Sequence, residues 1–420
     1  MGVFLTFLYI FNFTIIKGVR LSESSIAVFV ILFIACLVNR ECNKNTFRLA
    51  QSLYNKRIFK LLMLCIVIAA VVPVVQFTFD FSYLLTLLHQ FIVIFTGFLL
   101  VAYFKWSNIP IFESILKAFF IQSLIQFTCF ISPAFMRLTD IFRPDEIIEL
   151  RNRSYRGFRG LAISGSGYFG LAAAYAILFV ALAFYLDKWK KPILLKILVM
   201  FSLLFGAISA GRTALIGVVL FALIYAFRML KKLNTRTLRN TVAVFLIVLI
   251  GFLALRGPIT NYLRNNQTWF YMRYYLFEFL ENDTTNQGAS LENITSLTHM
   301  FRDMYFKLSP KQILFGDGRF TDPDGRFYMH TDVGLMRNLL YFGIFGTIVL
   351  YYYHIKTLFY NAYDRPKRIV AYFLLLISMV LEIKGQTMGF LIITQSMLLM
   401  ICSDYDEITK ETDEQCPALV

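Results

Sequence analysis

Arginines that could bind an anion lie in two short stretches of this sequence. The first alternates arginines with polar and aromatic residues, at Arg151, Arg153, Arg156 and Arg159. The second is Arg212 in the turn 209–213, which has small residues on both sides and apolar sequence beyond them. A guanidinium presents a planar fork of donors that matches the oxygens of a phosphate. These arginines therefore predict a phosphate site, whereas a solvated basic loop and an arginine reaching lipid headgroups are the structural alternatives.

A third stretch carries side chains that could move a proton. It opens near Arg273 and closes with Arg319, His330, Asp332 and Arg337. A carboxylate or an imidazole can take a proton from a sugar hydroxyl, so Asp332 and His330 are candidate general bases. Asp332 could instead cap the next helix, since Asp is a favoured N-cap. Asp332 and Arg337 lie about 140° apart around a helix, so they need not form a simple pair.

The composition defines the environment in which these residues must work. Of the 420 residues, 58% are hydrophobic and 16% are charged. A soluble domain has about 25% charged residues, so the sequence predicts an integral membrane protein. No separate soluble domain is expected, and residues 1–420 form a single membrane domain. The net charge of +15 is explained by anionic lipid headgroups and membrane orientation, so membrane lipids are expected partners and nucleic acid is not.

About twelve apolar stretches are long enough to cross a bilayer, since a span needs about 20 apolar residues. The sequence therefore predicts an all-α polytopic protein of about 12 transmembrane helices. The expected spans are approximately 2–18, 24–38, 59–79, 82–104, 111–135, 164–186, 192–210, 213–230, 238–255, 333–355, 367–384 and 387–402.

Basic residues in the connections between spans indicate the orientation. Cytoplasmic loops carry an excess of Lys and Arg. Four connections rich in these residues fall on one side of the membrane if the N-terminus lies inside: 39–58, 188–191, 228–239 and 356–368. The same phase places 136–163, the turn 209–213 and the long polar stretch 256–332 outside the cell.

The two large outer loops offer little for metal or redox chemistry. None of the six cysteines falls in them, and no dense set of carboxylate, His and Cys residues is present. Asp317 and Asp324 stand in Asp-Gly pairs that are typical of turns, so both are expected to be structural. No glycine-rich nucleotide loop is present. We therefore expect no metal and no cofactor.

The order of several motifs resembles the O-antigen polymerase/ligase superfamily over roughly residues 150–350. Four groups of residues carry the resemblance: Gly-Phe-Arg159-Gly followed by Gly-Tyr-Phe-Gly170, Ser209-Ala-Gly-Arg212-Thr-Ala, Leu-Phe-Gly316-Asp-Gly318, and Asp332-Val-Gly334 followed by Tyr341-Phe-Gly343-Ile-Phe-Gly346. The first group is similar to the sequence after the first periplasmic loop of the polymerases. The second resembles a turn that polymerases and ligases share. The last two resemble the end of their main periplasmic loop and the following helix.

This resemblance implies a GT-C-like fold in the bacterial inner (cytoplasmic) membrane, with 136–163 and 256–332 as periplasmic loops. It implies a metal-independent O-antigen or capsule polymerase of the Wzy type. Such an enzyme transfers a glycan from undecaprenyl diphosphate to the next undecaprenyl-diphosphate-linked oligosaccharide repeat unit, and a chain-length regulator is a possible partner.

The resemblance also suggests roles for individual residues. Arg159 and Arg212 would bind the lipid diphosphate, with Arg156 and Arg273 as secondary contacts. Asp332 or His330 would orient or deprotonate the acceptor hydroxyl. Arg319 would be a further substrate contact, and Arg337 a charge partner or glycan contact.

Two alternatives remain open. O-antigen ligases, which transfer the finished glycan to lipid A core or a protein, usually carry a His-Asn pair where this chain has Asp332, with His330 two residues earlier. That difference favours a polymerase. A flippase or transporter of lipid-linked oligosaccharides belongs to another class, and transporters tend to place charges at the bilayer midplane. Most charges here lie in loops, with Glu382 and Lys384 among the exceptions.

Overall fold

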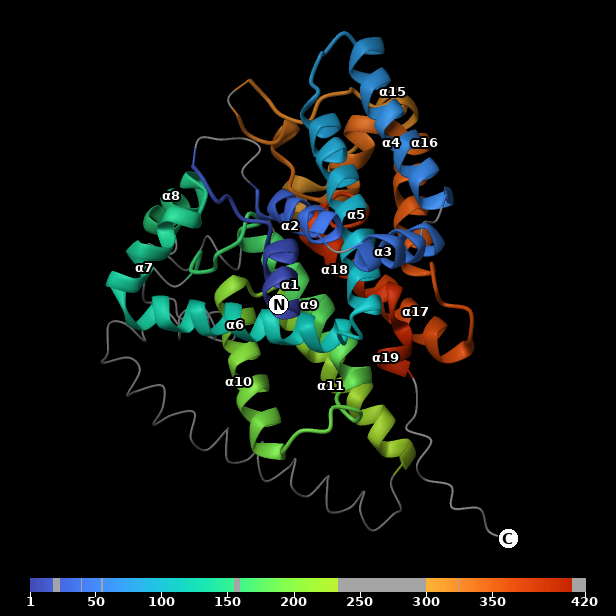
Figure 1. Cartoon of the computed structure of the whole chain (residues 1–420). Helices are drawn as coiled ribbons and strands as arrows, with labels where there is room; N and C mark the ends of the chain where they lie inside the picture. The colour runs from blue at the N-terminus through green and yellow to red at the C-terminus, as the bar shows by residue number, and fades with distance from the viewer. Residues whose placement is uncertain are drawn as a thin grey trace, which may run out of the picture.

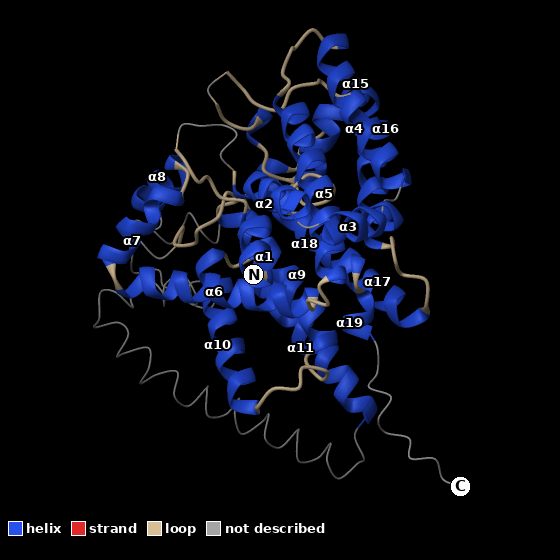
Figure 2. Ribbon diagram, in the orientation of Figure 1, coloured by secondary structure: helices blue, strands red, loops and turns tan. Residues whose placement is uncertain are grey.

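The computed structural model describes residues 1–17, 23–38, 40–53, 56–154, 159–232, 300–323 and 325–409. Within these ranges the chain forms helices joined by turns, and strand pairing is limited to two isolated bridges. Figure 2 shows this helical architecture. The expected all-α class is therefore confirmed. The expected span 238–255, and the candidate residues Arg156 and Arg273, lie outside the described residues.

The helices before the gap at 233–299 are α1 (Gly2–Phe11), α2 (Ser24–Val38), α3 (Arg40–Leu53), α4 (Lys56–Val75), α5 (Ser82–Trp106), α6 (Ile111–Ile131), α7 (Pro133–Thr139), α8 (Asp145–Ser154), α9 (Tyr168–Tyr185), α10 (Ile193–Ala210) and α11 (Ala214–Lys232). Those after it are α15 (Pro310–Phe315), α16 (Gly334–Leu358), α17 (Arg365–Glu382), α18 (Ile392–Ser403) and α19 (Tyr405–Thr409). In Figure 1, α7 and α8 lie at the left, α15 lies at the top with α4 and α16, and α10 and α11 point downwards.

Six of these helices are long and apolar enough to cross a membrane: α4, α5, α6, α9, α10 and α16. Four shorter apolar helices accompany them, namely α1, α2, α11 and α18. The chain is thus a multi-pass α-helical membrane protein by helix length and composition, but six spanning helices are found among the described residues where about twelve were expected for the whole chain. One reason is that α1 ends early, because its C-cap Asn12 adopts a left-handed conformation with φ 40°.

Helix α9 is surrounded by other helices, and it carries a run of small residues among larger apolar ones. Every residue of α9 from Gly170 to Tyr185 is buried, and alanines recur along it. It contacts α10, α11, α17 and α18. At the closest approach a Cβ on Gly217 of α11 would overlap the backbone of Ala176, so only glycine fits there. Small residues allow helix backbones to pack this closely in a membrane.

The connections between helices form two groups, and hydrogen bonds join connections of the same group. The amide of Phe320 donates to Asp80 Oδ2 at 2.7 Å, which joins two segments expected outside. At the other ends of the helices, Lys105 Nζ donates to the carbonyl of Ser403 at 2.8 Å, which joins two segments expected inside. This separation agrees with the predicted phase of the connections. Which group faces the cell exterior stays a prediction.

A kink in α16 holds the end of the long polar stretch. Gly343 has φ 67° and ψ −174°, a conformation that only glycine adopts readily, and it interrupts the helix. The carbonyls of Leu340 and Tyr341 accept hydrogen bonds from the amides of Asp317 and Gly318, at 2.6 and 3.2 Å. The Leu-Phe-Gly-Asp-Gly motif and the glycines of α16 are therefore one structural unit, which fixes the approach to Asp332 and Arg337.

Candidate functional site

Arg159 and the turn that carries Arg212 lie together. Both Nε and Nη2 of Arg159 donate to the carbonyl of Ala210, at 3.3 and 3.0 Å. The guanidinium of Arg159 also lies over the ring of Tyr168, 5.0 Å from its centroid. A Cβ on Gly211 would lie 3.1 Å from Arg159 Nη2, which explains the small residue at that position. Two arginines assigned to one ligand from sequence are thus brought to the same turn by the fold.

Lys384 adds a third cation that the sequence argument left unassigned. It follows the end of α17 and reaches solvent. Burial by neighbouring protein, followed by the charges of Arg159 and Arg212, lowers the pKa of the Lys384 ammonium. Asp332 acts in the opposite direction on that pKa. Arg159, Arg212 and Lys384, hereafter the cationic cluster, therefore lie close enough to sense one another and Asp332.

A buried carboxylate positions the segment that carries Lys384. Glu382 Oε1 accepts from Asn338 Nδ2 and Tyr351 Oη at 2.9 and 3.0 Å. Its Oε2 accepts from the amides of Thr387 and Met388 at 2.6 and 2.7 Å. Glu382 thus ties segment 383–391 to α16. The signal available in the sequence was a Glu and a Lys two positions apart at the end of an apolar stretch.

Asp332 is available for chemistry because it does not cap α16. The N-cap position belongs to Val333, and it is the hydroxyl of Thr331 that accepts from the Val333 amide, at 3.3 Å. The capping alternative for Asp332 is therefore wrong. Among the described residues the Asp332 side chain makes no hydrogen bond or ion pair. Although it reaches solvent, crowding by protein raises the pKa of its carboxyl, against the charges of Arg337 and Lys384.

The remaining candidates of the long stretch differ in exposure and in the groups that they contact. His330 is exposed and has φ 54°, an uncommon backbone conformation for a non-glycine residue. Arg337 lies on α16 between two aromatic rings and, as the spacing suggested, forms no ion pair with Asp332. Arg319 lies over the ring of Tyr328, 5.6 Å from its centroid. Asp317 accepts from Gln312 and Tyr328, which fits the structural role expected for it.

The arginine-rich first loop contains a structural pair that the sequence argument did not separate from the others. Arg151 donates to both carboxylate oxygens of Asp140, at 2.7 and 2.8 Å, and is only 2% exposed. Arg143 is fully buried and donates to Asp140 and to the carbonyl of Ala162. The expectation that Arg151 belongs to a functional arginine group does not hold. The side chain of Arg153 is among those not described.

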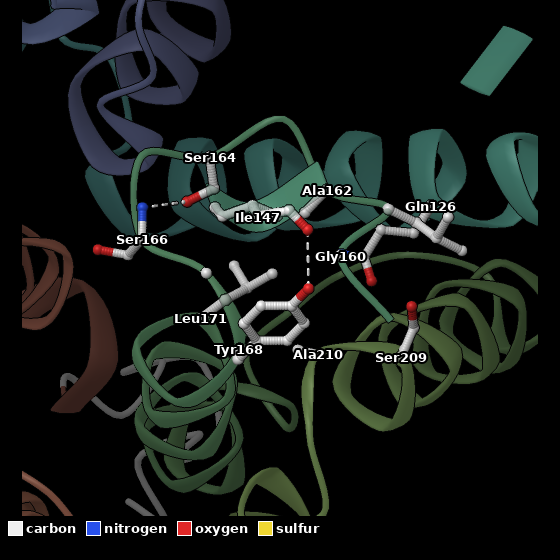
Figure 3. Close-up of a pocket in the computed structure, with 12 residues that line it drawn as sticks. Gln126, Ile147, Gly160, Ala162, Ser164, Ser166, Tyr168, Leu171, Ser209 and Ala210 are labelled. Atoms are coloured by element: carbon white, nitrogen blue, oxygen red, sulfur yellow. Dashed lines mark hydrogen bonds between the residues drawn. The ribbon is translucent and has the colours of Figure 1, made fainter. Parts of the chain in front are cut away.

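A small cavity lies between Tyr168 and the residues Ser209 and Ala210 of the turn that carries Arg212. Figure 3 shows Tyr168 directing its hydroxyl to the carbonyl of Ile147, at 2.9 Å, with Ser209 and Ala210 on the opposite side. The cavity measures about 10 Å³, which is room for about one water molecule. It cannot hold a sugar. A glycan held by the cationic cluster would therefore bind outside this cavity.

No family model, curated protein or solved structure matches this chain. In the described ranges, no three His, Cys, Asp or Glu side chains are grouped closely enough to hold a metal ion. The function is therefore inferred from the geometry of the site and from the order of the sequence motifs.

Proposed function

We propose that this protein is a polysaccharide polymerase that joins undecaprenyl-diphosphate-linked oligosaccharide repeat units at the periplasmic face of the bacterial inner membrane. The observation that carries the proposal is the meeting of Arg159, Arg212 and Lys384 near Asp332, at one end of the helices. A diphosphate needs several positive charges, and a sugar hydroxyl needs a group that can accept its proton. The cationic cluster and the carboxylate supply both.

The proposed reaction is a displacement at the anomeric carbon of the donor glycan. The acceptor hydroxyl oxygen bonds to that carbon while the bond from the carbon to the diphosphate oxygen breaks. The electron pair stays on the lipid diphosphate, where Arg159, Arg212 and Lys384 stabilise the developing charge. The hydroxyl proton passes to the Asp332 carboxylate, whose raised pKa makes it a better acceptor than an ordinary Asp.

Two other functions use the same ligand. A ligase would transfer the finished glycan to lipid A core or a protein, and its acceptor would meet Asp332 in the same way. A flippase would move the lipid-linked oligosaccharide without breaking the bond. The exposed position of Asp332 and Lys384 favours chemistry at one surface over transport through the bundle.

The site at which the glycan stalls when the gene is deleted separates these functions. We expect the lipid A acceptor to carry a single repeat unit in the deletion strain, because transfer continues without polymerisation. Lipid-linked polymer that accumulates without transfer would identify a ligase. Repeat units retained on the cytoplasmic side would identify a flippase. Analysis of lipid-linked and lipid A-linked glycans by gel and mass spectrometry distinguishes the three results.

A further inference from the structure

Arg337 is a buried guanidinium that lies between two aromatic rings. Its residue is 8% exposed, and its Cζ lies 4.0 Å from the ring centroid of Phe320 and 3.6 Å from that of Phe327. The two ring centroids are 6.3 Å apart with 60° between their planes, so the guanidinium lies in the angle between them. Nε and Nη2 are buried and have no hydrogen-bond partner among the residues that the structure describes.

The nearby carboxylates do not satisfy Arg337. Glu382 already accepts hydrogen bonds at both of its oxygens, from Asn338, Tyr351, Thr387 and Met388. Asp332 forms no ion pair with Arg337, as described above. By contrast, Arg143, which is also buried, donates to carbonyl, carboxylate and thiol acceptors from all three nitrogens. Burying a guanidinium without hydrogen-bond acceptors costs free energy. An acceptor group on a bound ligand would lower that cost.

The two unpaired nitrogens define the shape of the missing group. Nε and Nη2 lie on the same edge of the guanidinium, which is the edge that holds a carboxylate through two parallel hydrogen bonds. Phe327 is 43% exposed and Tyr328 is partly exposed, so aromatic faces stand at the mouth of this position. Such faces suit the apolar side of a sugar ring. The positive charge of Arg337 and the aromatic rings beside it together match a sugar that carries a carboxylate.

We propose that Arg337, between Phe320 and Phe327, binds the carboxylate of an acidic sugar, such as a hexuronic acid, in the acceptor glycan. The identity of the ligand as an acceptor rests on the proposed polymerase function, while the carboxylate site rests on Arg337 alone. Arg337 follows Asp332 by five residues, so the acidic group would bind in the same region as the attacking hydroxyl. The site would therefore select repeat units with a carboxylate on the terminal acceptor sugar or its neighbour.

The test compares two probes that differ in one group. The full-length protein is purified in detergent, and binding of methyl glucuronide and methyl glucoside is measured by ligand-observed NMR. We expect the glucuronide to bind at least about 10-fold more tightly, because two hydrogen bonds to a charged group are formed. Arg337→Met should abolish this preference. Equal binding of the two probes to the wild-type protein would overturn the inference.

Further variants control for folding and for general charge. Arg337→Lys keeps the charge but loses the two-pronged edge, so it should also bind the glucuronide weakly while the melting temperature stays near the wild-type value. Arg326→Met removes an exposed arginine of the same loop and should leave the preference intact. Inorganic phosphate that displaces the glucuronide at equal concentration would show a general oxyanion site and overturn the carboxylate assignment.

Binding of geranyl diphosphate to the same preparations separates this inference from the proposed function. Arg337→Met should leave geranyl diphosphate binding unchanged. A wild-type protein that prefers glucuronide but does not bind geranyl diphosphate would refute the polymerase proposal and leave the carboxylate site standing. A protein that binds geranyl diphosphate without preferring glucuronide would give the reverse result.

Discussion

Two groups of basic residues lie on the side of this protein expected to face outward. They differ in the charge of the groups next to them. In the first, Arg143 and Arg151 converge on the carboxylate of Asp140. In the second, burial, followed by the charges of Arg159 and Arg212, lowers the pKa of the Lys384 ammonium. Arginines that share a buried carboxylate hold a loop in place. Cations that crowd together favour an anion brought from outside. We therefore expect the first group to be structural and the second to bind a ligand.

The largest effect should come from breaking the first group. Asp140→Asn removes the carboxylate that faces Arg143 and Arg151, which are 0% and 2% exposed. Removal of one partner from a buried ion pair typically costs about 3 to 5 kcal/mol, because the other charge stays buried. We expect a clear drop in melting temperature. Asp145→Asn is the matched control: its partner is Lys17 on the surface, so the expected cost is below about 1 kcal/mol.

Acid should reproduce the effect of Asp140→Asn in the wild-type protein. Burial alone would raise the pKa of the Asp140 carboxyl, but hydrogen bonds and charges from Arg151 and Arg143 outweigh burial and lower it. The stability from this group is thus complete above the unfolded pKa of about 3.9 and is lost as the pH falls through the lower folded pKa. A Asp140→Asn protein that melts like wild type at neutral pH would refute the structural role.

A change at Asp332 should affect catalysis and leave stability intact. Asp332→Asn removes the proposed base, and loss of general base catalysis slows a reaction by about 100-fold or more. The melting temperature should not change, because the side chain makes no hydrogen bond within the described residues. In the wild type, polymerisation should decline as the pH falls through the raised pKa of Asp332. Full activity in both Asp332→Asn and His330→Ala would show that neither residue is the catalytic base.

A smaller effect should follow from disturbing the support of the second group. In Gly343→Ala, the new Cβ would overlap the carbonyl of Leu314, and alanine would have to adopt φ 67°. Such a conformation costs on the order of 1 to 3 kcal/mol. Because this kink holds the approach to Asp332, we expect stability and polymerisation to fall together. Gly325→Ala, with φ 81° but open space around its Cβ, should destabilise less.

The sequence predicted the helical class, the positions of most helices and the pairing of Arg159 with Arg212. These features follow from local hydrophobicity and from motif order. It did not predict that Arg151 is neutralised by Asp140, because the contact needs the turn between α7 and α8 to fold back. It also did not predict the role of Lys384, since Glu382 places that segment through hydrogen bonds to residues of α16 far away in sequence. Apolar length alone also did not predict that α18 is only 12 residues long, where a span was expected over 387–402.

The affinity of the purified protein for geranyl diphosphate tests most directly whether the cationic cluster is a diphosphate site. Wild type should bind this probe, and Arg212→Lys should bind it about 10-fold more weakly or worse at an unchanged melting temperature, because an ammonium cannot reproduce the donor fork of a guanidinium. Arg326→Lys, an exposed arginine outside the cluster, should bind like wild type. Equal affinity in Arg212→Lys and wild type would contradict the assignment of this cluster to the lipid diphosphate.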